Sequence, residues 1–145
     1  MNFVTKEPIN KGWSSDKKYC VTDENGTQYL LRVSDIAQRD RKQFEFFMMK
    51  QVASIGVPIC QPIEFGTCQD GVYSIQSWID GEDAEQVMSG YSDTEQYVYG
   101  LEAGRILRKI HTIPAPATQE DWEIRFNRKM DQKIKKYGEC PLKYE

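Results

Sequence analysis

A short polar loop and one arginine are the residues of this chain best suited to binding an anion. The loop is Gly12-Trp13-Ser14-Ser15, and its backbone N–H groups and serine hydroxyls are hydrogen-bond donors. Arg32 lies inside a later apolar segment, residues 29–33, and supplies a positive charge at a fixed place. Loop donors beside a fixed cation are suited to holding phosphate, so this stretch predicts a phosphate cradle.

Both features also have a simpler interpretation. A Gly-Trp-Ser-Ser loop between strands is commonly just a turn, and an arginine near a strand end commonly extends into water. A cation on the apolar side of a sheet, in contrast, needs an anionic partner because an unpaired buried charge is costly. The elements that position the loop and the arginine therefore decide between the two interpretations.

The segments around the loop are predicted to be strands. Asn25-Gly26 is the strongest signal for a tight hairpin, and it predicts a type I′ turn with positive φ at both residues. Residues 1–34 are therefore expected to form a strand, a flexible loop, a strand, a tight turn and a strand. Because side chains alternate along a strand, Arg32 shares a face with Leu30, whereas Leu31 points to the other face.

A helix is predicted to follow, from about residue 36 to residue 54, with Asp35 able to cap it. Glu45 in this helix is either a solvated flank residue or a carboxylate that reaches Arg32 and holds it as an ion pair. Gly56 fits the position that ends the helix. The predicted apolar stripe of the helix, spaced by three and four residues, comprises Phe44, Phe47, Met48, Gln51, Val52 and Ile55.

Two more strands are predicted over residues 59–65 and 72–79, joined by a hairpin signal at Asp70-Gly71. Pro62 places the first of them at an edge of the sheet, because proline cannot donate to a central strand pair. Five strands with one helix inserted after the third give an α+β fold.

The pattern becomes helical after Gly81, with helices predicted over residues 82–88 and 92–111 and from about residue 118 to residue 138. We therefore predict two domains, residues 1–80 and residues 81–145, with residues 76–80 as the connector. A crevice between two lobes is a common place for a ligand.

The composition argues against several classes of protein. The net charge of −3 argues against a dedicated nucleic-acid binder and is too small to predict a cationic substrate. The N-terminus has no apolar leader and no run reaches transmembrane length, so we expect a cytoplasmic protein without membrane contact. One histidine and four cysteines without Cys-x-x-Cys spacing argue against a zinc site and predict reduced thiols.

The order of these elements resembles the small lobe of a protein kinase followed by the first helices of its large lobe. Motifs spread over residues 8 to about 115 make the resemblance more specific, to the N-terminal part of an aminoglycoside phosphotransferase-like kinase. These motifs are Gly12–Tyr19, Tyr29–Val33, Gly56-Val57-Pro58, Ile63–Gly66, Trp78–Glu82 and Leu107–His111.

The resemblance implies a nucleotide site. The loop, above all Ser14 and Ser15, would lie over the phosphates of ATP or GTP. Arg32 stands where such kinases carry a basic residue, usually lysine, that touches the α- and β-phosphates, and Glu45 would be its helix partner. Arginine is a departure, because its planar fork binds phosphate with a different geometry from a lysine point charge.

The resemblance also implies how the base is held. Leu30 would cover the base, and Gln76 would take the gatekeeper position. The Ser77 carbonyl and the Ile79 N–H would hydrogen-bond the base at the connector.

The catalytic loop of such kinases, His-Gly-Asp-x-x-x-x-Asn, has no counterpart here, because no histidine follows His111. That loop orients the acceptor hydroxyl and, with a later aspartate, binds Mg²⁺. We therefore expect no catalytic or metal-binding residue in this chain, and interpret it as an inactive fragment or truncated product of an enzyme. His111 itself fits a structural role at a helix end better than that of a general base.

The parent protein would use ATP or GTP with Mg²⁺ to phosphorylate a hydroxyl of a small molecule. Aminoglycosides are the leading acceptor class, which would make it an antibiotic-resistance enzyme. The alternatives are a choline, homoserine, fructosamine or macrolide kinase, a non-catalytic kinase-like binding module, and a plain structural domain. Self-association is also expected, because a large lobe cut after three helices should leave apolar residues uncovered, among them Leu101, Ile106, Leu107 and Trp122.

Overall fold

The computed structural model describes residues 2–142. By internal contacts the chain divides into two compact units, residues 1–113 and 114–145. The predicted domain boundary between residues 80 and 81 falls inside the first unit and stays a prediction. Residue 1 and residues 143–145, at the outer ends of the two predicted domains, lie outside the described residues.

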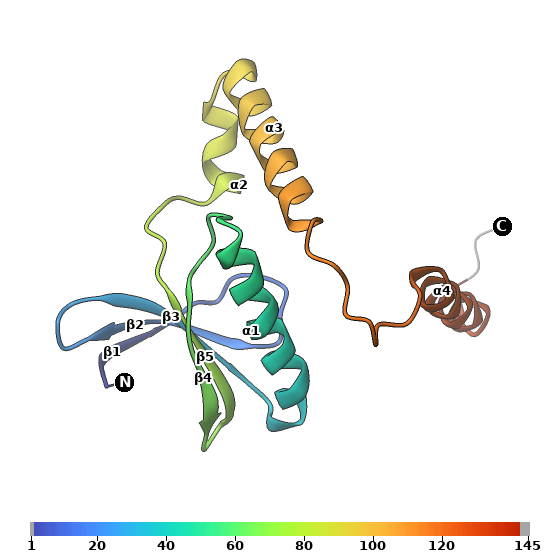
Figure 1. Ribbon diagram of the computed structural model, residues 1–145, viewed down its shortest axis with the longest axis horizontal. Helices are drawn as coiled ribbons and strands as arrows, with labels where there is room; N and C mark the ends of the chain where they lie inside the picture. The colour runs from blue at the N-terminus through green and yellow to red at the C-terminus, as the bar shows by residue number, and fades with distance from the viewer. Residues whose placement is uncertain (1, 143–145) are drawn as a thin grey trace. The chain divides into compact units, whose positions relative to one another are not determined.

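Five antiparallel strands form one sheet in the order β1-β2-β3-β5-β4 (Figure 1). The strands are β1 (Phe3–Pro8), β2 (Lys17–Asp23), β3 (Gln28–Ser34), β4 (Pro62–Cys68) and β5 (Gly71–Ser77). A 3-10 turn, η1 (Ile36–Gln38), and helix α1 (Arg39–Ser54) lie between β3 and β4. The predicted α+β fold is confirmed, and β4 is an edge strand, as Pro62 indicated.

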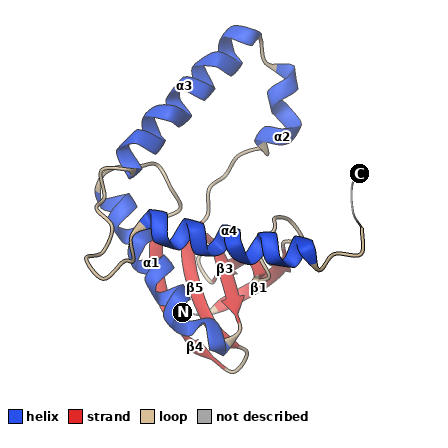
Figure 2. Ribbon diagram, turned by 90° about the vertical axis from the view of Figure 1, so that its right-hand side faces the viewer, coloured by secondary structure: helices blue, strands red, loops and turns tan. Residues whose placement is uncertain are grey.

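The two faces of the sheet differ in chemistry. One face carries a buried apolar cluster formed by Val21, Leu31, Val33 and Ile75. Helix α1 lies against the other face (Figure 2), where Phe46 packs on Phe65 of β4 with ring centroids 5.6 Å apart. Arg32 lies on this helix-covered face, so the predicted alternation along β3 is confirmed and the cation lies away from the apolar cluster.

The inward side of α1 is not the predicted stripe. Phe44 and Phe47 are 46% and 51% exposed, whereas Phe46 is buried, so the prediction was wrong at these two positions. The other predicted members, Met48, Gln51, Val52 and Ile55, are half-buried. Lys42, one turn before Phe46, and Glu45, directly before Phe46, line the cavity on the inward side. Apolar residues occur on several sides of α1, and periodicity cannot choose between sides when the inward side also carries charged residues that have partners.

The β2–β3 hairpin also differs from its prediction. Gly26 has a φ of +81°, but among the described residues no non-glycine residue has positive φ, so the turn is not type I′. Instead, Asp23 organises a longer turn, because its Oδ1 accepts the N–H groups of Asn25 and Thr27 at 2.9 and 2.8 Å. Asparagine and aspartate side chains commonly replace backbone acceptors in this way.

The helical part begins with α2 (Ala84–Val87), η2 (Met88–Gly90) and α3 (Asp93–Ile110). The N-terminus of α3 carries a capping box, since Ser92 Oγ accepts the Glu95 N–H and Glu95 Oε2 accepts the Ser92 N–H. The second unit holds α4 (Trp122–Gly138), capped by Asp121. No helix in the described part of the chain is both long and apolar enough to cross a membrane.

Replacement of Gly71 by alanine should be unusually costly. Gly71 has a φ of +130°, and a Cβ there would lie 2.1 Å from the Ser34 carbonyl oxygen. Gly26 also has a positive φ, but no atom lies within 4 Å of the position that a Cβ would take there. We expect Gly26→Ala to lower the free energy of unfolding by about 1–2 kcal/mol, and Gly71→Ala by at least about 2 kcal/mol more. Urea unfolding followed by circular dichroism measures both, and equal losses would contradict the steric argument.

Helix α3 exposes Tyr97, Leu101 and Leu107, and in the second unit α4 exposes Trp122 and Ile124. Exposed apolar surface of this kind favours association in water. We expect the mass measured by sedimentation equilibrium to rise above 16.9 kDa as the concentration of the chain increases. A constant monomer mass across the concentration series would contradict this prediction.

Candidate functional site

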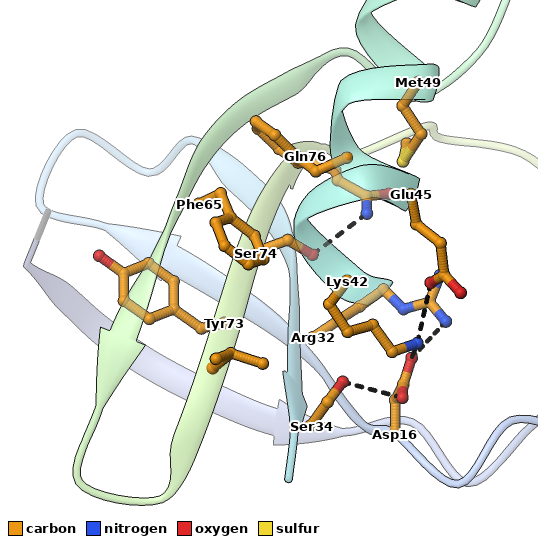
Figure 3. A pocket seen from close by; sticks show the side chains of 12 residues that line it. Asp16, Arg32, Ser34, Lys42, Glu45, Met49, Phe65, Tyr73, Ser74 and Gln76 are labelled. Atoms are coloured by element: carbon orange, nitrogen blue, oxygen red, sulfur yellow. Dashed lines mark hydrogen bonds and ion pairs between the residues drawn. The ribbon is translucent and has the colours of Figure 1, made fainter. Parts of the chain in front are cut away.

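A buried carboxylate joins the loop, the sheet and the helix (Figure 3). Asp16 ends the β1–β2 loop, and its side chain is only 2% exposed. Its Oδ2 accepts hydrogen bonds from Arg32 Nη2 at 2.6 Å and from Lys42 Nζ at 3.0 Å. Its Oδ1 accepts the Ser34 hydroxyl at 2.9 Å. One side chain from the loop is thus bound by two residues of β3 and one of α1.

Strand pairing explains why these groups meet. In the β2–β3 register Lys17 is opposite Val33 and Lys18 is opposite Arg32, so the residue before Lys17 lies beside Ser34. Alternation turns Arg32 and Ser34 toward α1. The first turns of α1 then bring Lys42 over the same point, because α1 packs on β4 and β5.

The pairing predicted between Glu45 and Arg32 is wrong. Glu45 Oε1 accepts Arg41 Nε at 2.8 Å, and Glu45 Oε2 accepts Lys42 Nζ at 3.0 Å. Glu45 therefore connects to Arg32 only through Lys42 and Asp16. Asp16 was missed because the loop was assigned to the nucleotide alone, and because only the observed register, with Lys18 opposite Arg32, places this acid on the arginine's face.

The cluster carries a small net positive charge. Burial acts to raise the pKa of the Asp16 carboxyl, but hydrogen bonds from Lys42, Ser34 and Arg32 outweigh burial and leave that pKa below its usual value. The pKa of Glu45 is likewise lowered, since Lys42 and Arg41 outweigh its partial burial. Two carboxylates and the cations Arg32, Lys42 and Arg41 leave one net positive charge, which favours an anion.

Arg32 keeps donors for such an anion. A guanidinium carries five N–H donors, and Nη2 of Arg32 serves Asp16 and, at 3.4 Å, the Ser14 hydroxyl. The Arg32 side chain is 31% exposed, more than twice the 14% of Lys42. Arg32 is therefore held on one side by a buried carboxylate and is open to solvent on the other.

The predicted phosphate loop frames an open hollow of about 390 Å³. Gly12 there has a φ of +91°, a conformation that favours glycine. Lys18, the second residue of β2, donates its Nζ to the Lys11 carbonyl and so braces the loop. Trp13 is fully exposed, and Ser14 is the loop hydroxyl that meets Arg32.

The residues predicted to hold the base gather further along the same strands. The β3–β5 register pairs Leu30 with Gln76 and Arg32 with Ser74, so the base-covering residue and the gatekeeper are neighbours. Leu30 and Arg32, two residues apart, are separated by about 7 Å along the strand. A base and its phosphates could span that separation, so the arrangement is compatible with the predicted site.

The connector is partly fixed and partly open. The Ser77 N–H donates to the Gln61 carbonyl at 2.9 Å, and the Ser77 hydroxyl accepts the Gln61 N–H at 2.8 Å. Gln76 is buried, and Ile79 beyond it is exposed. No contact in the described structure tests the predicted roles of Leu30, Gln76, Ser77 and Ile79, and these roles stay predictions.

A second, smaller cavity lies between α1 and the sheet and is too small for a nucleotide. Its volume is about 30 Å³, room for one or two waters, and Asp16, Lys42, Glu45 and Gln76 are among its lining residues. The carboxylates on it do not suit a cation, because Asp16 and Glu45 are already neutralised by lysine and arginine. Among residues 2–142 no group of three or more histidine, cysteine, aspartate or glutamate side chains could hold a metal ion.

Comparison with known proteins decides the family. The model of the "Phosphotransferase enzyme family" matches residues 5–143. The chain belongs to this family. The match includes the loop, Arg32, α1 and the connector of this phosphotransferase-family chain, and it confirms the resemblance carried by the sequence motifs. A search of curated proteins finds no match.

Asp16→Asn should destabilise the family member's first unit in a pH-dependent way. Asparagine keeps the shape but cannot neutralise Arg32 and Lys42, so we expect a loss of about 3 kcal/mol in the free energy of unfolding at pH 7. Because the pKa of Asp16 is lowered on folding, the wild-type advantage is complete above about pH 4. It should shrink as the pH falls from about 4 through the folded-state pKa.

Urea unfolding of both proteins between pH 7 and pH 3 measures this difference. Asp40→Asn is the matched control, since the Asp40 side chain is 98% exposed, and we expect it to change stability by less than about 0.5 kcal/mol. An Asp16→Asn loss that stays constant down to pH 3 would show that the charge of the carboxylate is not what stabilises the cluster.

Proposed function

We propose that this chain is the nucleotide-binding part of a phosphotransferase that moves the terminal phosphoryl group of ATP or GTP to a hydroxyl of a small molecule. Family membership supports the reaction class. The observation that carries the site is Arg32, held by Asp16 at 2.6 Å beside Ser14 and open to solvent on its other side. A cation that is fixed in this way loses little freedom when a phosphate binds.

In this proposal the backbone and hydroxyls of Ser14 and Ser15 cover the phosphates, while Arg32 contacts them from the strand. Leu30 and the connector hold the base. Mg²⁺ accompanies the nucleotide, and its protein ligands, like the catalytic aspartate, belong to a part of the parent protein that carries the loop His-x-Asp-x-x-x-x-Asn. The transfer step is therefore proposed for that longer protein.

We further propose an aminoglycoside as the acceptor, on the strength of the motif resemblance. Another small molecule with a hydroxyl group, such as choline, homoserine, a fructosamine or a macrolide, is the alternative. We propose the cytoplasm as the compartment, because ATP and GTP are available there. The four free cysteines fit its reducing conditions.

Arg32→Ala should weaken nucleotide binding at least tenfold, because a charge-assisted hydrogen bond contributes about 1.5–3 kcal/mol. Calorimetric titration of the chain with Mg-ATP and with Mg-GTP measures the dissociation constants and also shows which nucleotide is preferred. Arg105→Ala is the matched control, since Arg105 pairs with Glu102 on α3 and should leave affinity unchanged. Equal affinities for the two variants would remove Arg32 from the phosphate site.

The gene beyond the Glu145 codon tests the enzymatic part of the proposal. An in-frame His-x-Asp-x-x-x-x-Asn followed by a later aspartate is the expected result, and the enzyme it encodes should then be assayed with a panel of purified acceptors. A stop codon directly after Glu145 would leave a kinase-like binding module and overturn the transferase assignment for this protein.

A further inference from the structure

We propose that Asp16 is the positioning residue of the phosphate site, holding Arg32 in the orientation that receives the nucleotide phosphates and, through Lys42, fixing the loop and strand to α1. The inference rests on the proposed nucleotide-binding function and adds a residue to that site. Asp16 does not touch the ligand itself, since its side chain is 2% exposed and three neighbours enclose its oxygens.

Two cations share one oxygen of this carboxylate. Arg32 Nη2 and Lys42 Nζ lie 2.6 and 3.0 Å from Oδ2 of Asp16, so the two positive groups are close neighbours in a mostly enclosed place. Like charges at such separation repel, and the repulsion grows as water is excluded. Only the ionised carboxylate between them allows Arg32 and Lys42 to stay where they are.

No other acid in the cluster can take over this role. Glu45 is 42% exposed and is already bound to Arg41 and Lys42. If Asp16 lost its charge, Glu45 could still hold Lys42, but Arg32 would lose its anionic partner. Arg32 would then be free to swing into solvent, as long arginine side chains do.

Asp16 also sets the position of the loop. It is the last residue before β2, only two residues after Ser14, and Ser14 contacts the same Nη2 atom of Arg32. The buried Asp16 carboxylate thus fixes the positions of both the loop and Arg32. Loss of the Asp16 charge should therefore weaken binding of the phosphates. Binding of the base, which is expected near Leu30 and the connector, should be largely unaffected.

The test compares three ligands that share a base and differ in phosphates: adenosine, Mg-ADP and Mg-ATP. In the intact chain at pH 7 we expect Asp16→Asn to weaken Mg-ATP and Mg-ADP at least tenfold and to change adenosine affinity by less than twofold. Asp23→Asn is the matched control, because Asp23 ends the same strand β2 and its carboxylate contacts the hairpin turn and the Tyr29 hydroxyl but no residue of the phosphate site. It should bind all three ligands like the wild type.

A double-mutant cycle identifies the residue through which Asp16 acts. In an Arg32→Ala background, Asp16→Asn should weaken Mg-ATP by less than a further threefold, because its effect passes through Arg32. A full tenfold loss in that background would overturn the proposal. An equal loss for adenosine would also overturn it, by showing a general structural effect, and so would unchanged or tighter Mg-ATP binding by Asp16→Asn.

The outcomes separate this inference from the proposed function. If Arg32→Ala loses Mg-ATP binding and Asp16→Asn does not, only the positioning role fails. If the wild-type chain binds no nucleotide, the proposed function fails and this inference fails with it. If Asp16→Asn does not fold, nitrogen NMR of the wild-type arginine side chains decides: restricted rotation of the Arg32 guanidinium supports the role, and rotation as free as that of Arg105 overturns it.

Discussion

The buried carboxylate of Asp16 is the interaction on which the rest of the small lobe depends. An ionised carboxylate in an enclosed place needs several donors, and here a hydroxyl, an ammonium and a guanidinium supply them. These donors come from β3 and α1, and the acid comes from the loop. The β2–β3 register, the alternation along β3 and the placement of α1 must therefore all be correct at once for the charge to be tolerated.

The two faces of the sheet therefore differ in role: one is an apolar core and the other holds the charged cluster. The cluster of Val21, Leu31, Val33 and Ile75 has no polar member, and its neighbours are aromatic. The opposite face mixes Phe46 and Val72 with buried polar groups such as Gln76. The first face thus supplies a purely apolar core, whereas the second face carries charged groups that are tolerated because they are paired with one another.

Features set by local chemistry were predictable from the sequence. The Ser92–Glu95 capping box, the helix end at Gly56, with its φ of +71°, and the edge position of Pro62 each follow from a local backbone requirement. The element order was predictable for the same reason. It led to the family through motifs whose spacing is kept over most of the chain.

Features set by partners distant in sequence were not predictable. The inward side of α1 follows from Asp16, 26 residues before Lys42, and periodicity within the helix contains no information about it. The β2–β3 turn was mispredicted because the Asp23 side chain competes with the Asn-Gly preference. The partner of Arg32 was misassigned because two acids were available and only the packed structure shows which of them is enclosed.

Trp13, fully exposed at the tip of the loop, has a thermodynamic consequence. An indole in water leaves roughly 150–250 Å² of mostly apolar surface uncovered, which at about 25 cal/mol per Å² corresponds to about 4–6 kcal/mol of unused hydrophobic free energy. If the indole were buried against another surface, this hydrophobic free energy would offset the entropy lost when the loop becomes ordered. Water therefore disfavours the exposed position of this indole, and any contact that buries Trp13 gains free energy from the solvent.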